Sequence, residues 1–135
     1  MLKVGDKASF EKTISESDVY LFAGITGDLN PLHINQEKAK NSIFGERIVH
    51  GMLVGGLVST VIGCYLPGAG TIYLSQNFEF VAPVKISDTI KAEVEIVEIV
   101  SRKKGIYKLE TCAFNQNGKK VLNGYAVVKW DSNLR

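Results

Sequence analysis

Residues 52–66, with the sequence MLVGGLVSTVIGCYL, decide the fold of this chain. Apolar side chains occur all around a helix of this sequence rather than along one stripe, so we expect a helix that is enclosed on most sides. A membrane-spanning helix needs about 20 residues, and this shorter segment also contains glycine, serine and threonine. It therefore predicts a buried core helix, in which the adjacent Gly55 and Gly56 let another backbone or a ligand approach closely. The sequence PGAG at 67–70 ends the helix.

After this helix the pattern changes to a period of two, which predicts strands over residues 71–80, 89–102, 105–115 and 120–130. Within 89–102, apolar residues fall mainly on even positions and charged residues on odd ones, as a sheet with one buried and one wet face requires. The sequence QNG at 116–118 predicts a hairpin turn. With an earlier strand over residues 7–13, the chain is expected to adopt an α+β fold, a curved antiparallel sheet wrapped around a long central helix.

Size and composition limit the classes of protein to consider. The 135 residues are most simply one domain spanning 1–135, which is large enough to bury a substantial core. Sixteen basic and fourteen acidic residues give a net charge of +2 without a long run of one sign, so we expect no nucleic-acid or membrane partner. The basic run 102–104 is expected to be a solvated hairpin turn.

The cysteines and the N-terminus indicate the compartment. Cys64 and Cys112 lie in apolar surroundings far apart in the sequence, which predicts two buried, reduced thiols in a cytosolic protein. The first residues contain no apolar signal segment. We therefore expect a cytoplasmic location.

The loop at residues 26–33, TGDLNPLH, holds a carboxylate and an imidazole five residues apart. On a regular helix Asp28 and His33 would point in different directions, because residues i and i+5 do not share a face. Pro31 has no N–H and pushes Asn30 toward extended geometry, so we expect a turn instead of a helix, and this turn can bring the two side chains together. The carboxylate can then take a proton from water, while the imidazole holds or protonates a second atom. The spacing alone also fits a capping Asp and a surface His.

Two helices are expected to flank this loop. Ser15 and Asp18 form a capping box that starts the first helix, whose end delivers Asp28 into the loop. Asn35 is expected to cap the second, a short polar helix over residues 36–40.

The segment 49–52, VHGM, opens the apolar helix. A helix N-terminus presents unpaired N–H groups and partial positive charge, which suits an oxygen that becomes negative in a transition state. Gly51 lets a substrate approach this backbone, although close packing explains the glycine equally well. We expect His50 to be a packed or hydrogen-bonded scaffold residue. Ser59, two turns into the helix, is either a polar group of the pocket or a hydroxyl bonded to the carbonyl one turn back.

Residues 22–33, FAGITGDLNPLH, followed by IVHGM at 48–52, resemble the MaoC-like, or hydratase 2, motif of the (R)-specific enoyl-CoA hydratases. The similarity continues through LPG at 66–68 and QNFEFVAPV at 76–84, while the later strands agree in pattern only. The resemblance implies a hot-dog fold, in which a bent antiparallel sheet wraps a long helix, and a homodimer in which two subunits pair their sheets.

The same resemblance implies a lyase of fatty acid metabolism without a metal or redox cofactor. Water adds syn to trans-2-enoyl-CoA and gives (3R)-hydroxyacyl-CoA, a polyhydroxyalkanoate precursor. Carried over to this chain, Asp28 is the base on the attacking water, and His33 holds that water and shares in protonating the α-carbon. Gly51 donates its N–H to the thioester oxygen as the enolate develops. Ser59 and Asn30 are expected to support the site. Which of Asp28 and His33 delivers the proton to the α-carbon stays open, because a coupled pair titrates as a unit.

Other functions stay open from the sequence. A (3R)-hydroxyacyl dehydratase that acts on acyl-carrier-protein substrates would use the same site. An acyl-CoA thioesterase would share the fold, and an acyl-binding module would bind the acyl group without catalysis. The thioesterase is disfavoured because the loop with Asp28 and His33 precedes the central helix in the hydratase manner. The acyl-chain length is also open, since the residues that could face the chain are Leu53, Val54, Leu57, Ile72, Leu74 and Phe78.

Overall fold

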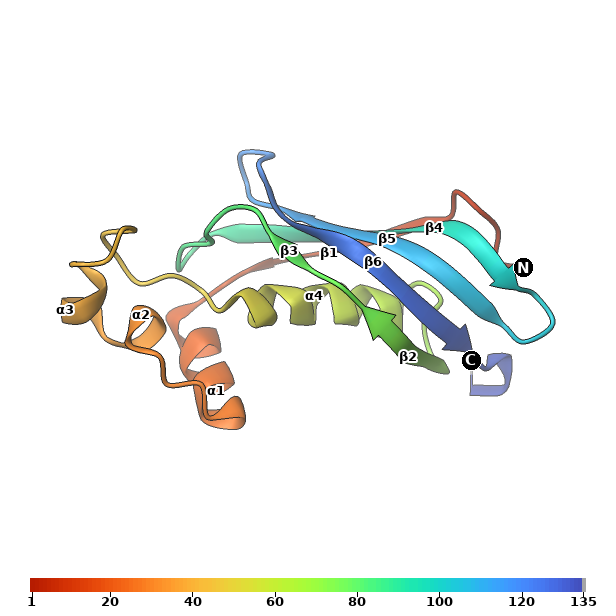
Figure 1. Cartoon of the computed structure of the whole chain (residues 1–135), viewed down its shortest axis with the longest axis horizontal. Coiled ribbons are helices and arrows are strands. Elements are labelled where there is room, and N and C mark those ends of the chain that lie inside the picture. The colour runs from red at the N-terminus through yellow and green to blue at the C-terminus, as the bar shows by residue number, and fades with distance from the viewer. Residues whose placement is uncertain (135) are drawn as a thin grey trace.

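Six antiparallel strands form one sheet in the computed structural model, which describes residues 1–134 (Figure 1). The strands follow the order β1-β4-β5-β6-β2, and the short β3 pairs with β6. Their bounds are Lys7–Thr13 (β1), Thr71–Gln76 (β2), Glu79–Phe80 (β3), Thr89–Ser101 (β4), Ile106–Phe114 (β5) and Lys120–Trp130 (β6). The helices are Glu16–Thr26 (α1), Pro31–Ile34 (α2), Gln36–Ala39 (α3) and Gly51–Cys64 (α4), with a 3-10 turn at Ser132–Leu134. The expected α+β architecture is confirmed.

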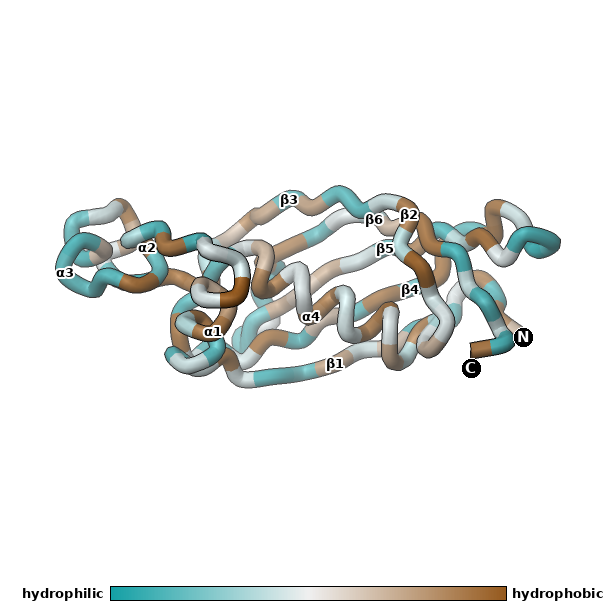
Figure 2. Tube along the Cα trace, turned by 90° about the horizontal axis from the view of Figure 1, so that it is seen from below, coloured by the Kyte–Doolittle hydropathy of each residue, from teal (hydrophilic) through white to brown (hydrophobic). Residues whose placement is uncertain are grey.

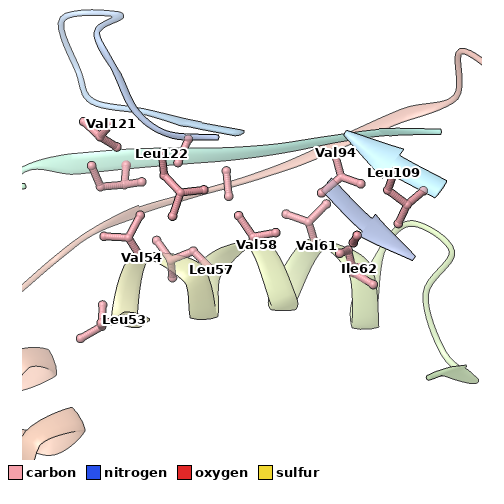
Figure 3. Close-up of a cluster of buried hydrophobic side chains, with 14 of the residues drawn as sticks. Leu53, Val54, Leu57, Val58, Val61, Ile62, Val94, Leu109, Val121 and Leu122 are labelled. Carbon is pink, nitrogen blue, oxygen red and sulfur yellow. The ribbon is translucent and has the colours of Figure 1, made fainter. Parts of the chain in front are cut away.

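The long helix α4 lies against one face of the sheet and forms the centre of the hydrophobic core (Figures 1 and 3). Val58 and Val61 of α4 point toward Val94 of β4, and Leu109 of β5 extends the same cluster (Figure 3). The inward side chains of β4 have no exposed surface, and these are Ile90, Ala92, Val94 and Ile96. Both the alternation along β4 and the core helix are thus confirmed. Within residues 1–134, no helix combines the length and the apolar character that a membrane crossing requires.

The side of α4 that faces away from the sheet is open in a single chain. Its exposed residues form what we call the α4 strip, namely Met52, Gly56, Ser59, Gly63 and Cys64. No other element crosses this side in the view from below (Figure 2). The expectation of enclosure on most sides is therefore wrong for one chain, because the sheet covers only one side. Of the paired glycines, Gly55 packs against the Phe78 ring, where an added Cβ would lie 2.6 Å from Cε2, and Gly56 faces open space.

The first helix, α1, begins and ends as the sequence predicts. Ser15 Oγ accepts the Asp18 N–H at 3.1 Å, and Asp18 Oδ2 accepts the Ser15 N–H at 2.9 Å, which completes the capping box. The Ser15 hydrogen bond, helped by Lys12, lowers the pKa of Asp18. At the other end Gly27 adopts a left-handed φ of 80°, and its N–H donates to Ala23 O at 2.8 Å. This cap stops the helix one residue before the loop carboxylate.

The strand expected over residues 71–80 is divided into β2 and β3 at residues 77–78. Asn77 Oδ1 accepts the Tyr125 N–H at 2.8 Å, so a side chain takes the place of a ladder carbonyl. Gly124 allows this close approach, because an added Cβ would lie only 1.9 Å from Asn77 O. Such an interruption depends on the partner strand, and the local pattern of alternation does not reveal it.

Both predicted turns are present, but only one of the two cysteines is buried. Residues 116–118 form the expected hairpin turn, with Gly118 at a φ of 76°, and the basic run 102–104 lies in the turn between β4 and β5. Both cysteines are free, and Cys112 is buried as expected. Cys64 is exposed instead, because it ends α4 on the side away from the sheet.

Candidate active site

Asp28 follows the cap of α1 directly, in a segment fixed by local hydrogen bonds. Thr26 Oγ1 donates to Phe22 O at 2.8 Å and accepts the Asp28 N–H at 3.2 Å. The Asp28 carboxylate in turn accepts the Asn30 N–H at 3.3 Å through Oδ1. The side chain is exposed in a single chain and lines a cavity of about 450 Å³. The end of α1 therefore sets the position of this carboxylate.

His33 lies in the one-turn helix α2, which the sequence analysis did not predict. Pro31 is its first residue, and Asn30 caps it, since Asn30 Oδ1 accepts the Leu32 N–H at 3.1 Å. As expected, no helix runs from Asp28 to His33, since residues 27–30 are not helical. The short helix α2 begins only after this break, because proline is favourable at the first helical position, where its missing N–H has no partner to lose. The expected extended geometry before the proline is confirmed, with a ψ of 123° at Asn30.

The ring of His33 is only 8% exposed and is anchored to the segment before α4. His33 Nδ1 lies 2.8 Å from Ile48 O, and because a carbonyl only accepts, Nδ1 carries the hydrogen and Nε2 is left for another partner. The Ile48 N–H donates to Leu32 O at 3.2 Å, and the Val49 N–H donates to Val84 O at 2.7 Å. These hydrogen bonds hold α2 against the start of α4.

Asp28, His33 and His50 bring their side chains together. One carboxylate oxygen and one ring nitrogen from each histidine all lie within 4.8 Å of one another. The expected convergence of Asp28 and His33 is therefore confirmed. His50, which precedes α4, adds a ring that stacks on that of His33 with a centroid distance of 3.9 Å. Burial lowers the pKa of His50.

These three side chains are close enough to be considered as metal ligands, because one donor atom from each lies within 4.8 Å of the others. Tetrahedral zinc with Zn–N bonds of about 2.1 Å needs donor atoms roughly 3.4 Å apart. The rings of His33 and His50 are stacked and inclined by 29°, and one nitrogen of each ring already donates to a backbone carbonyl oxygen, Ile48 O or Asp28 O. The geometry fits proton transfer better than metal binding.

Gly51, the first residue of α4, lines the same cavity as Asp28, His33 and His50. The cavity has a volume of about 450 Å³, and its wall is mainly apolar. The first N–H groups of a helix have no carbonyl one turn back, and within residues 1–134 the Gly51 N–H has no acceptor. The cavity thus combines three ionisable side chains, a free backbone donor and an apolar wall.

The two residues expected to support the site lie elsewhere. Ser59 belongs to the α4 strip and lines a second pocket of about 290 Å³ rather than the cavity described above. It hydrogen-bonds to Tyr73, whose hydroxyl also donates to Gln76 Oε1 at 3.1 Å, and burial raises the pKa of Tyr73 to about 12. Asn30 caps α2 and is absent from the cavity wall. The supporting roles of both residues stay predictions.

Several residues that line the cavity with Asp28, His33 and Gly51 were not predicted from the sequence. Val121 and Leu122 of β6 reach the cavity because β6 pairs with β3, which lies beside α4. No local motif marks them, and only the correct strand order would have identified them. Of the residues considered for contact with an acyl chain, Val54 lines this cavity, whereas Leu74 and Phe78 line the second pocket.

Comparison with protein families identifies the family of this chain. The sequence profile described as "MaoC like domain" matches residues 3–115. The chain belongs to the MaoC-like family. The resemblance of residues 22–33 and 48–52 to this family is thereby confirmed.

MaoC-like relatives cover nearly the whole chain. The (R)-specific enoyl-CoA hydratase of Rhodospirillum rubrum is 47% identical over 127 residues, which are 94% of this chain and 87% of that protein. A mitochondrial 3-hydroxyacyl-[acyl-carrier-protein] dehydratase of Solanum lycopersicum is 41% identical over 93% of this chain and 76% of its own length. The solved (R)-hydratase from A. caviae involved in PHA biosynthesis matches with a TM-score of 0.92 and 41% identity, over 96% of this chain and 98% of that one. The hot-dog fold is therefore confirmed.

Proposed function

We propose that this MaoC-like chain is an (R)-specific enoyl-CoA hydratase, a hydro-lyase that reversibly adds water to trans-2-enoyl-CoA and gives (3R)-hydroxyacyl-CoA. One observation carries the proposal: Asp28 and His33 approach within 4.8 Å at a cavity that Gly51 also lines. A water that donates a hydrogen bond of about 2.8 Å to each group joins acceptors roughly 4.5 Å apart. The two side chains are therefore spaced to hold one water molecule.

The hydrogen-bond partners of this water determine its direction of attack. The Asp28 carboxylate accepts one of its hydrogens, and His33 Nε2 accepts the other, because Nδ1 is already bonded to Ile48 O. With both hydrogens held, an oxygen lone pair faces the β-carbon of the enoyl thioester. Asp28 takes the proton as the new carbon–oxygen bond forms.

The electrons displaced by this attack move to the thioester oxygen and form an enolate. The unpaired N–H of Gly51, at the positive end of α4, donates to this oxygen where the charge develops. The α-carbon then receives a proton from the Asp28 and His33 pair, on the face from which water came, and this gives syn addition. The pair needs no metal or redox cofactor for these steps.

Gly51 offers a direct test of this oxyanion site. An added Cβ would lie 2.6 Å from Phe80 Cε1, so Gly51→Ala is expected to displace the Phe80 ring into the cavity. We expect kcat/KM to fall at least about tenfold, or ~1.4 kcal/mol. Phe80 is 54% exposed and free to move, so the midpoint of thermal unfolding should change little.

The matched control is Gly24→Ala in α1, where an added Cβ has no neighbour within 4 Å. It should leave kcat/KM unchanged and stabilise the fold by about 0.5 to 1 kcal/mol, because alanine is the better helix former. Equal activity of the Gly51→Ala enzyme and the wild type would count against the oxyanion role.

Turnover of crotonyl-CoA by the purified chain tests the function itself. We expect the ultraviolet absorbance of the conjugated thioester to fall, and chiral analysis of the product to give the (3R)-hydroxyacyl thioester. Release of free thiol without hydration would indicate a thioesterase. Tight acyl-CoA binding without turnover would indicate a binding module.

The carrier is the second question, because a dehydratase of acyl-carrier-protein substrates would use the same groups. The higher identity to a CoA-named relative, 47% against 41%, supports CoA. Matched crotonyl thioesters of CoA and of acyl carrier protein would separate the two. A kcat/KM that favours the carrier protein at least about tenfold would reverse the assignment. A series of chain lengths in the same assay would define the acyl preference.

We further propose that the chain forms a homodimer through the α4 strip and the neighbouring β2. Met52 and Leu74 are 58% and 52% exposed and line one pocket beside Ser59, so a large apolar area is uncovered in one chain. Sedimentation should give a dimer. Leu74→Lys should raise the dimer dissociation constant at least about 100-fold, because it places an unpaired charge in the interface.

The control for the dimer is Val4→Lys, which changes an equally exposed apolar residue near the N-terminus, 56% exposed, and should leave the dimer intact. A wild-type monomer at micromolar concentration, or a Leu74→Lys dimer as tight as the wild type, would contradict the proposed interface.

We place the reaction in the fatty acid metabolism of the cytoplasm. The product class, (3R)-hydroxyacyl-CoA, is a monomer for polyhydroxyalkanoate, and the structurally similar A. caviae hydratase serves that biosynthesis. Polymer yield with and without the gene, beside a fixed synthase, would test this supply.

A further inference from the structure

We propose that His50 is a positioning residue that holds the Asp28 backbone, the His33 ring and the first turn of α4 in one fixed arrangement. The proposal rests on the proposed hydratase function for its kinetic consequences. His50 is 2% exposed, so its role is exerted within the protein and needs no contact with the substrate. Three independent contacts support it.

The first contact joins His50 to the loop that carries the proposed base. His50 Nε2 lies 3.2 Å from the backbone carbonyl oxygen of Asp28. A carbonyl oxygen only accepts, so Nε2 bears the hydrogen and donates it. Asp28 is otherwise held only by exposed local bonds to Thr26 and Asn30. Among the described residues, the His50 bond is therefore the one that ties Asp28 itself to the buried part of the chain.

The second contact joins His50 to the proposed partner of that base. The rings of His33 and His50 stack with centroids 3.9 Å apart, and Phe22 packs against His50 at 4.8 Å. His33 is also pinned through Nδ1 by Ile48 O. One hydrogen bond and one stacked face together leave the His33 ring little freedom to rotate, so its Nε2 keeps a constant direction.

The third contact is covalent, because His50 is the residue before Gly51. His50 O accepts the N–H groups of Leu53 at 3.0 Å and Val54 at 3.3 Å, and these bonds form the first turn of α4. The same residue thus fixes the direction in which the Gly51 N–H points. The side chain of His50 therefore positions the base and the imidazole, and its backbone positions the oxyanion donor.

A neutral ring is required for this arrangement. His50 Nδ1 is buried and has no hydrogen-bond partner within residues 1–134, so a second proton there would be unpaired. The positive end of α4 also disfavours an imidazolium at this position. Burial and the neighbouring His33 act in the same direction and lower the pKa of His50. A neutral His50 places no positive charge beside the His33 ring.

Two substitutions test the hydrogen-bond donor and the flat ring of His50 separately. His50→Gln keeps an amide N–H near the position of Nε2, whereas His50→Phe keeps a flat ring without a donor. A displacement of about 1 Å in a catalytic group can cost about 100-fold in rate. We expect His50→Phe to lower kcat for crotonyl-CoA about 100-fold with KM within about threefold, and His50→Gln to restore kcat to within about tenfold of the wild type.

The control for a merely structural effect is Val58→Ala, which opens the core beside α4 at a residue with no exposed surface. It should destabilise the fold by about 1 to 3 kcal/mol and leave kcat per folded molecule unchanged. A His50→Phe enzyme that loses stability but keeps its kcat would behave like this control and would overturn the proposal.

A second readout needs no enzymatic activity and so stands apart from the proposed function. In His50→Phe, hydrogen exchange should accelerate at the amides of residues 27–33, while the amides of β4 and β5 keep wild-type protection. Unchanged exchange at 27–33 would overturn the positioning role even if the activity falls. If His50→Phe does not fold, His50→Gln decides: wild-type exchange at 27–33 supports the role, and a 100-fold loss of kcat in a folded protein refutes it.

Discussion

Asp28→Asn is expected to lower kcat for the hydration of crotonyl-CoA by about 10³-fold or more, near the upper end of what a general base contributes. The amide keeps the size of the side chain and an Oδ1 that can still accept the Asn30 N–H, now at 3.3 Å. It cannot accept a proton from water. Because the side chain is exposed and bonded only locally, the loop and the fold should be unchanged.

Asp131→Asn is the matched control. Asp131 also follows a regular element, here β6, and its Oδ1 accepts the N–H two residues on, from Asn133, at 3.0 Å. This change should leave kcat and KM as in the wild type. Hydration by the Asp28→Asn enzyme within about tenfold of the wild-type rate would remove Asp28 from its role as base and favour a site in which water is activated differently.

Local rules account for most of the elements predicted from the sequence. The capping box at Ser15 and the hairpin turn at 116–118 depend only on neighbouring residues, and both are confirmed. The alternation in β4 depends on one buried face, and it is confirmed as well. The predictions miss features where a residue's conformation depends on a distant partner, or where one residue type favours two different local structures. Residues 77–78 interrupt a strand because of Gly124, and Pro31 starts a one-turn helix that was not predicted.

The site shows the same division. Asp28 and His33 come from one short motif, and the sequence predicted their convergence, which the structure confirms. The hydrogen bond from His50 to the Asp28 carbonyl depends on how the start of α4 packs against the end of α1, and sequence spacing contains no signal for it. Ser59 illustrates a different limit, because the sequence determines its position on the helix but not which pocket it lines, and it lines the second pocket.

His33→Asn is the second substitution with a large expected effect. The Asn side chain can place an N–H where His33 Nδ1 now donates to Ile48 O at 2.8 Å, so the anchor of α2 is retained. It offers nothing at the position of Nε2, and it cannot carry a proton near neutral pH. We expect kcat to fall about 10²- to 10³-fold, with little change in thermal unfolding.

The double variant Asp28→Asn, His33→Asn tests whether both groups act on the same water. Groups that serve one step together lose their effect together, so the second substitution should cost far less in the absence of the first partner. We therefore expect the double variant to be no more than about tenfold slower than the slower single variant. If the two losses multiply instead, Asp28 and His33 act on separate steps, and the water held between them at a separation within 4.8 Å is not the nucleophile.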